Sequence, residues 1–420
     1  MTTSTQQDPF ILDAIAADVH GDAQRLRALG PLVEAVLSDS GLKVLVCPDR
    51  DVAERILGDR ETFRKNPEHW TDLRDGLVPQ GGIMEFATMP GMLNADGAEH
   101  RKLRGLVSDA FTARRVENLR PRVEEIVQSL LGDVAAAATT NGFLELRRRF
   151  AFELPMQILT HLFGLDPDSG EVLARNYTAI HASTTAEASL AGKAGVLAVI
   201  AALIEEKRRH PADDLTSALI AATDGQDAAL DDELLVATLM LFLFAGQATT
   251  ADLIVNCLKA LADHPGELAH VRAGVLSVED VVKEVLRWNG PIQTIMFRYP
   301  VRDVVVPGTD VLVKKGRAIA IHVAATGRDE RAYGADAATF DPSRDTDIKK
   351  HLAFGYGVHY CMGAPLALMM TTTAVAQLIE RFDLDRTGAP TSRPISSFSP
   401  NSDAELWMRL SARTTAPAAA

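Results

Sequence analysis

Cysteine is rare in this sequence: the 420 residues include only Cys47, Cys257 and Cys361, which are far apart along the chain. A disulfide framework needs a dense, even set of cysteines, and a structural zinc site needs ligands at short spacings such as CxxC. Neither pattern is present, so the sequence predicts neither disulfide bonds nor structural zinc. Any thiol chemistry must depend on one cysteine and the residues around it.

Positive charge is in deficit. The chain has 43 Lys and Arg against 56 Asp and Glu, which gives a formal net charge of −13. Proteins that bind nucleic acid neutralise phosphates with an excess of cations. We therefore expect no nucleic-acid partner.

Long apolar runs are missing as well. The longest, residues 234–245, has about a dozen residues, whereas a membrane-spanning helix needs roughly 20. The first residues, MTTSTQQDPFILDAIAADVHGD, lack the basic and apolar segments of a signal peptide. The sequence thus predicts a cytoplasmic protein with no membrane partner.

No repeat or low-complexity linker divides the chain, so we expect a single domain over residues 1–420, with residues 1–8 and 414–420 disordered. Apolar periodicity predicts a mainly helical fold with a small β region. Helices are expected from residue 98 and over 52–57, 114–138, 154–165, 170–182, 191–209, 231–264 and 279–288. Strands are expected at 43–47 and within 297–329, and residues 70–93 read as a long, apolar loop.

The predicted helix 231–264 is apolar on nearly every face in its first half, so it should run through the core. Its middle reads AGQATT, residues 245–250. Glycine is costly inside a helix, and threonines can bond back to the preceding turn and bend it. Either a bound group or a close helix crossing would explain such a weak point.

Cys361 lies in HLAFGYGVHYCMGAPLA, residues 351–367, among Gly355, Gly357 and Gly363. Glycines let the backbone approach another group closely, and backbone N–H groups beside a helix N-terminus stabilise a thiolate. The pattern favours a metal-ligating thiolate. A buried cysteine in a tight turn is the alternative.

Two pairs of side chains share helix faces. His100 and Arg104 are four residues apart and would be a solvated basic face if they acted alone. Glu284 and Arg287 are three apart among apolar neighbours, which indicates a buried ion pair with Arg344 as a third member.

Together these motifs resemble the cytochrome P450 family. FGYGVHYCMG, residues 354–363, matches the haem-binding signature of that family, and the ExxR motif at 284–287 and the AGxxTT motif at 245–250 precede it in the family's order. The resemblance covers about residues 30–410 and is closest to soluble bacterial members of the actinomycete type. It implies the P450 fold, with haem b between the long distal helix and the cysteine loop.

The resemblance also implies residue roles. Cys361 would be the proximal thiolate ligand of the haem iron, with Phe354, Gly355 and Gly363 around it. The residues that match the family's partners of the haem propionates are His100, Arg104, Arg298 and His351. Glu284, Arg287 and Arg344 match its structural triad.

On the distal side, Ala245, Gly246 and Thr249 match the family's oxygen-binding groove. The family usually has an acid before this threonine, but here the residue is Ala248, which cannot carry a proton. Either water with Gln247 or a substrate group supplies protons, or the reaction needs fewer of them. A second departure places Leu368 and Met370 where charged residues are usual, so either partner docking or local packing differs.

By the same resemblance, the substrate pocket is formed by the loop at 78–92, the distal helix, residues 291–295 and the turn 396–399. The expected contacts are Met84, Phe86, Met89, Leu241, Phe242, Ile292, Gln293, Thr294 and Phe398. These are mostly apolar, so we expect a medium-sized, largely apolar substrate such as a secondary metabolite.

Three functions are compatible with these features. The first is O2-dependent monooxygenation by a monomer that receives electrons from NAD(P)H through a ferredoxin reductase and a ferredoxin. The second, suggested by Ala248, is an atypical reaction such as oxidative coupling, ring formation or nitric-oxide reduction. The third, a haem sensor or helical scaffold, is disfavoured because such a protein would not need Thr249.

Overall fold

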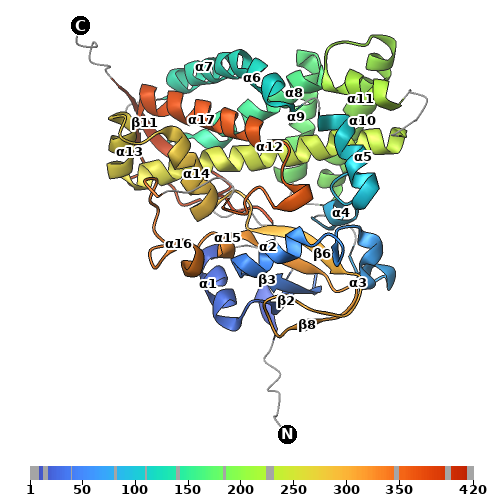
Figure 1. Cartoon of the computed structure of the whole chain (residues 1–420). Coiled ribbons are helices and arrows are strands. Elements are labelled where there is room, and N and C mark those ends of the chain that lie inside the picture. Colours follow the sequence, from blue (N-terminus) through green and yellow to red (C-terminus); the bar gives the residue numbers. More distant parts are fainter. Residues whose placement is uncertain are drawn as a thin grey trace.

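A 32-residue helix, α12 (Asp232–Asp263), runs through the middle of the molecule (Figure 1). The computed structural model describes residues 9–12, 18–38, 40–79, 83–108, 111–138, 142–182, 186–223, 231–344, 350–392 and 399–413. The Asp231 side chain caps α12 by accepting from the Leu234 N–H at 2.8 Å, and the helix ends before Pro265. The long helix that the sequence predicted over residues 231–264 is therefore confirmed.

Most helices gather around α12 in the upper part of Figure 1. In contact with it are α8 (Glu153–Phe163), α10 (Ala186–Arg209), α11 (Leu215–Thr223), α13 (Pro265–Arg272), α14 (Val278–Asn289) and α17 (Ala364–Arg381). The helical part also includes α5 (Gly97–Ser108), α6 (Ala113–Asn118), α7 (Arg120–Ala137) and α9 (Pro167–Ala182). The helices α1 (Val19–Leu29), α2 (Arg50–Gly58), α15 (Val323–Thr326) and α16 (Glu330–Tyr333) instead lie beside the sheet in the lower part of Figure 1. A π-helix, η3 (Arg147–Ala151), precedes α8.

A smaller part, below the helices in Figure 1, is built on a six-stranded sheet of order β1-β2-β3-β9-β6-β4. Its strands are β1 (Phe10–Leu12), β2 (Val33–Leu37), β3 (Lys43–Cys47), β4 (Phe63–Arg64), β6 (Thr294–Pro300) and β9 (Ile319–His322). The remaining strands form β10 (Phe382–Asp385)–β11 (Trp407–Ala412)–β5 (Leu144–Glu145) and β7 (Val304–Val305)–β8 (Leu312–Val313). The prediction of a mainly helical fold with a minor β region is confirmed.

Two predicted boundaries were wrong. The helix expected over 114–138 is divided at Leu119 into α6 and α7. Pro121 explains the division, because proline lacks an N–H and fits only the first turn of a helix. The loop expected over 70–93 contains α3 (Thr71–Arg74) and α4 (Ile83–Thr88), which are too short for their periodicity to show in the sequence.

Among the residues that the structure describes, two helices are long and apolar enough to cross a membrane by length and composition alone, residues 187–209 of α10 and all of α12. The sequence predicted no such span because it was judged on uninterrupted apolar runs. In the structure α12 packs against α8, α14 and α17, and α10 packs along α9. Half of the apolar window of α12 is buried inside the protein, as in a core helix, whereas 28% of that of α10 is buried.

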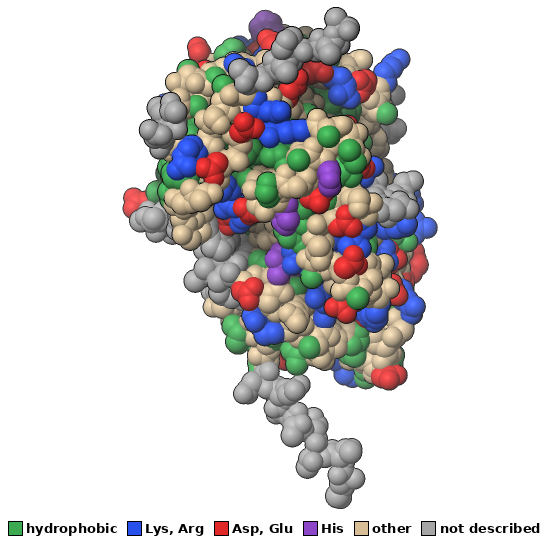
Figure 2. Space-filling view, turned by 90° about the vertical axis from the view of Figure 1, so that its left-hand side faces the viewer, with side chains coloured by type: hydrophobic (Ala, Val, Ile, Leu, Met, Phe, Trp, Pro, Cys, Tyr) green, Lys and Arg blue, Asp and Glu red, His purple; other side chains and the backbone are tan. Residues whose placement is uncertain are grey.

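On the face shown in Figure 2, acidic and basic side chains lie next to one another, with hydrophobic side chains between them. The negative net charge is therefore not gathered into one patch on that face. The expected disorder at residues 1–8 and 414–420 concerns segments outside the described residues.

Candidate active site

The cysteine loop, which begins at His351, contains the short 3-10 helix η4 (Gly357–His359) and leads into α17. Its backbone is left-handed at Gly355 and Gly357, with φ of 76° and 71°, a conformation that only glycine adopts without strain. The Cys361 N–H donates to the Phe354 carbonyl at 2.8 Å. The loop thereby closes on itself and brings Phe354 beside the cysteine.

The surroundings of the Cys361 sulfur act in opposite directions on its ionisation. Burial is the largest influence and raises the pKa of the thiol above its ordinary value. Backbone N–H groups of Gly363 and Ala364 donate toward the sulfur, and the Arg104 cation is close enough to lower the same pKa. The site can hold a thiolate, and a coordinated metal ion would supply the remaining stabilisation.

Cys361 also faces an interior space. Its side chain is exposed, yet burial in the protein dominates its pKa, so the exposed surface lies inside the molecule. Met362 beside it packs on a hydrophobic cluster to which α5 contributes Leu103 and α12 contributes Phe242 and Leu243. The cysteine loop and α12 therefore share one hydrophobic cluster.

The middle of α12 has one open face. Ala245 is exposed, and Ala248 and Thr249 are half-buried, although the turns on both sides are buried. Residues three and four apart share a helix face, so these three positions border the same space. The Thr249 hydroxyl donates to the Ala245 carbonyl at 2.6 Å, and Gly246 packs against Leu159 of α8. The predicted weak point of the helix thus forms an interior opening.

Buried cations line the side of this region where α5, β6 and the cysteine loop meet. Arg298 is 4% exposed, and burial lowers its pKa to about 10. Burial, with the Arg298 cation second, also holds the pKa of Lys65 well below its usual range. A register shift in β6 between Ile295 and Arg298 sets the direction of the Arg298 side chain.

His100 and Arg104 contribute to the same group from α5. His100 is buried with its ring 4.1 Å from that of His359, and the Arg104 guanidinium donates to the Tyr360 carbonyl at 2.7 Å. Burial lowers the pKa of His359, and Arg298 lowers it further. The sequence analysis did not select His359 as a site residue, although its position inside the glycine-rich signature at 354–363 could have indicated one.

These residues fit a haem. Asp96 is the acid whose charge acts on Lys65, His100 and Arg298 within the described chain, and it already accepts the N–H groups of Lys65 and Asn66. A buried group of cations needs more negative charge than that. The two carboxylates of a haem would provide it, and the Cys361 sulfur would reach its iron.

His351 begins the loop and is 2% exposed. Its Nδ1 accepts from the Ala353 N–H at 3.2 Å, and its ring lies 6.0 Å from that of Phe354. The structure therefore places His351 beside Phe354, on the same segment as Cys361.

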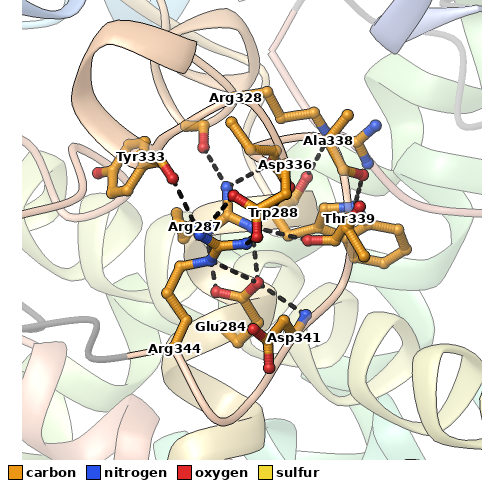
Figure 3. Close-up of polar contacts among 12 residues, drawn as sticks. Glu284, Arg287, Trp288, Arg328, Tyr333, Asp336, Ala338, Thr339, Asp341 and Arg344 are labelled. Atoms are coloured by element: carbon orange, nitrogen blue, oxygen red, sulfur yellow. Dashed lines mark hydrogen bonds and ion pairs between the residues drawn. The ribbon is translucent and has the colours of Figure 1, made fainter.

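The predicted ion-pair triad is assembled as expected (Figure 3). Arg287 donates to both carboxylate oxygens of Glu284, at 2.8 and 2.6 Å, and to three backbone carbonyls, those of Gly327, Ala337 and Thr339. Arg344 lies 3.7 Å from Glu284 and also pairs with Asp336. These contacts anchor the segment before the cysteine loop to α14.

The predicted pocket residues divide into two groups. Phe86 is half-buried with its ring 5.6 Å from that of Phe244, and Met89 is half-buried on the same segment. Met84 instead packs in a cluster beside the sheet, and Phe242 stacks on Phe111. Leu241 and Thr294 are buried. Gln293 donates to the Pro400 carbonyl at 3.1 Å, and Ile292 forms an isolated antiparallel β-bridge with Pro400. Phe398 lies outside the described residues.

Gln247 faces away from the interior space. It is fully buried, and its side-chain amide donates to the Phe152 carbonyl at 3.3 Å. This placement is unfavourable for the suggestion that Gln247 supplies protons. Leu368 and Met370 pack on the main core, so different packing accounts for the apolar residues at these positions.

Comparisons with known proteins agree with this geometry. Residues 196–401 match the family model described as Cytochrome P450. The chain is 36% identical to 2-hydroxy-5-methyl-1-naphthoate 7-hydroxylase of Streptomyces carzinostaticus over 89% of this chain and 90% of that protein. It is 34% identical to cytochrome P450 monooxygenase PikC of Streptomyces venezuelae, covering 90% and 88%.

Among solved structures, CYP154C4 from Streptomyces sp. W2061 is similar, with a TM-score of 0.87, 34% identity and coverage of 96% of this chain and 98% of that one. The cysteine loop, the open face of α12 and these similarities lead to one conclusion. This chain belongs to the cytochrome P450 family, whose members bind haem through a cysteine thiolate.

Proposed function

We propose that this protein inserts one oxygen atom of O2 into a medium-sized, largely apolar small molecule, by hydroxylation or epoxidation. One observation carries the proposal: the loop that holds Cys361 packs on the same hydrophobic cluster as α12, and Cys361 on the loop and Ala245 on the helix both remain exposed. A haem held there would have its thiolate on one side and substrate and O2 on the other. Membership of a family of monooxygenases supports this assignment.

We assign the haem contacts as follows. The Cys361 sulfur holds the iron, with Phe354, Gly355 and Gly363 forming the loop around it. Bound haem supplies activation of O2, which the electron density of the thiolate favours. The carboxylates of the haem pair with His100, Arg104, Arg298 and His351, and we add to this set the buried Lys65 and the half-buried His359, on both of which the Arg298 charge acts.

On the distal side, Gly246 and the small Ala245 and Ala248 leave room beside the helix, and Thr249 offers a hydroxyl to position water. Phe86, Met89 and Phe244 present aromatic and thioether surface suited to an apolar substrate. A secondary metabolite is the substrate class we propose, because similar proteins include a naphthoate hydroxylase.

Electrons must come from outside, since two are needed for each O2 that is split. We propose a ferredoxin and its NAD(P)H-linked reductase as donors to a cytoplasmic monomer. Titration of the ferric protein with reduced ferredoxin tests this partner, and failure of several bacterial ferredoxins to reduce it would contradict it.

The haem-thiolate assignment is tested by the reduced, carbon-monoxide-treated protein. We expect the long-wavelength Soret band of a thiolate-ligated haem in the wild type and its loss in Cys361→Ala. Cys47→Ala, which changes a buried cysteine in β3, is the matched control and should keep the band. A normal band in Cys361→Ala would refute the assignment.

A second candidate function rests on Ala248. Without an acid at this position, the alternative is oxidative coupling, ring formation or nitric-oxide reduction, in which water or a substrate group in place of a side chain at position 248 supplies the protons. Products of the wild type with substrates found by an iron spin-state screen distinguish the two functions. Incorporation of labelled oxygen from O2 supports monooxygenation, and coupled products without it support the alternative.

A further inference from the structure

We propose that Asp252, paired with Arg147, supplies protons to the distal side of the site in place of the acid that is absent at position 248. The inference rests on the proposed monooxygenase function and concerns how its protons arrive. Asp252 acts through the water and hydroxyl at Thr249, so it is a positioning and proton-holding residue.

Helix geometry places Asp252 on the face of α12 that carries Ala245 and Ala248. Asp252 follows Ala248 by four residues and Ala245 by seven, and these spacings keep side chains on one face of a helix. It therefore lies one turn beyond the open part of α12, on the face that borders the interior space. The carboxylate is displaced by one turn from position 248.

The Asp252 carboxyl is buried and paired. The Asp252 side chain is 2% exposed and forms an ion pair with Arg147 of η3, whose side chain is 14% exposed. Removing a carboxylate from water is costly, so a buried one needs such a partner. Arg147 is the more exposed member, so the pair extends from the core at α12 toward the solvent.

Polar side chains from three other segments surround Asp252. Groups that face Asp252 within the described chain are Arg147 from η3, Tyr177 from α9 and Ser402 from the segment before β11. The Tyr177 hydroxyl lies at the backbone of Ala248. Polar groups therefore continue from Arg147 past Asp252 to the turn that carries Ala248.

The carboxyl is also suited to holding a proton. Burial raises the pKa of Asp252 and outweighs the attraction of Arg147, which is the next influence and lowers it. Arg147 contacts Oδ1, so Oδ2 is the atom on which we place the proton. Asp252 takes up a proton from the side where Arg147 lies and passes it toward Thr249. The carboxyl is then reprotonated, so it is not consumed.

The alternative is a purely structural role, in which the pair only holds η3 against α12. Asp252→Asn distinguishes proton supply from this structural role because it keeps the shape of the side chain and removes its ionisation. Asp214→Asn, which breaks the buried Lys207–Asp214 pair of 3.0 Å between α10 and the start of α11, is the matched control for loss of an ion pair.

With equal haem-thiolate content verified by the carbon-monoxide band, we expect Asp252→Asn to form product at least about tenfold more slowly. Hydrogen peroxide should rise per NAD(P)H consumed, and Asp252→Glu should restore part of the coupling. Asp214→Asn should keep wild-type coupling. Wild-type coupling in Asp252→Asn would overturn the inference while leaving the haem-thiolate function intact.

A second measurement needs no turnover. Infrared spectra of the ferric, haem-loaded protein should show a protonated carboxyl band that titrates above the ordinary range of aspartate and is missing in Asp252→Asn. If that variant binds no haem, Arg147→Met is used, since it leaves the carboxyl in place. Its band should titrate at higher pH than in the wild type, and an unmoved midpoint would contradict the inference.

Discussion

His100 of α5 and His359 of the cysteine loop lie ring beside ring, with centroids 4.1 Å apart. Burial lowers the pKa of both imidazoles, and neighbouring arginines lower it further. The Lys65 and Arg298 cations beside these rings would be unfavourable with Asp96 as their counter-charge among the described residues. Their arrangement is explained by a dianionic group that they share, which is the role we assign to the haem carboxylates.

The first prediction concerns haem retention. We expect His100→Asn and His359→Asn each to speed the transfer of haem to a scavenger protein by roughly tenfold, because each loses a donor to a carboxylate worth about 1.5 kcal/mol or more. His270→Asn, at an exposed position of α13, is the control and should not change the rate. Unchanged transfer in both site variants would exclude this pairing.

Arg287 gives the second prediction. Its five hydrogen bonds to Glu284 and to three carbonyls require a planar, forked donor that lysine cannot replace. Arg287→Lys should lower the free energy of unfolding by about 3–5 kcal/mol, as expected when a buried pair is broken. Urea unfolding of haem-loaded protein measures this loss.

Arg344→Lys is the companion variant. Arg344 is farther from Glu284, at 3.7 Å, and its Asp336 partner is mostly exposed. Exposed pairs are worth about 1 kcal/mol or less, so the loss should be smaller than in Arg287→Lys. Equal losses in the two variants would show that the central role given to Arg287 is wrong.

The third prediction separates backbone strain from close packing in the cysteine loop. Gly357 and Gly388 have nearly equal φ, 71° and 73°, but a Cβ at Gly357 would lie 3.2 Å from the Leu57 carbonyl oxygen, whereas at Gly388 it meets nothing within 4 Å. Gly388→Ala should cost about 1–2 kcal/mol from strain alone. Gly357→Ala should lower the free energy of unfolding by more than this and should also reduce haem content. Urea unfolding measures the stability, and haem absorbance measures the haem content. Equal stability and haem content in the two variants would contradict this interpretation.

The sequence predicted α12, the triad and the glycine-rich loop because each carries a strong local pattern. A cap and a long apolar period define α12, and Glu284, Arg287 and Arg344 bear charges that need partners wherever the chain is apolar. The family resemblance then related Cys361 to His100 and Arg298, which are distant in sequence and which no local pattern could have joined.

What the sequence missed depends on tertiary contacts. His359 gained significance only once α5 placed His100 beside it. Asp252 stood outside the AGxxTT pattern, and its partner Arg147 comes from a π-helix that periodicity does not reveal. Gln247 was considered as a proton source because the sequence does not show which way a side chain on a helix buried all round will face.

The last prediction is a loss of stability in mild acid. Burial lowers the pKa of His20 from 6.5 to about 4, with the Arg328 cation as the second cause. Burial lowers the pKa of His322 to about 3, with His20 and Arg27 contributing. Below pH 6.5 the unfolded chain takes up protons that the folded chain refuses, so the free energy of unfolding decreases as pH falls toward 4.

His20→Gln should therefore flatten part of this decrease. The wild type loses at most about 3 kcal/mol through His20 between pH 6.5 and 4, because each pKa unit corresponds to about 1.4 kcal/mol. Urea unfolding of haem-loaded protein at several pH values measures the slope, and subtracting the wild-type curve removes the contribution of other groups. His270→Gln, which changes an exposed histidine, should leave the slope as it is. A slope in His20→Gln equal to that of the wild type would mean that His20 is not held neutral by its surroundings.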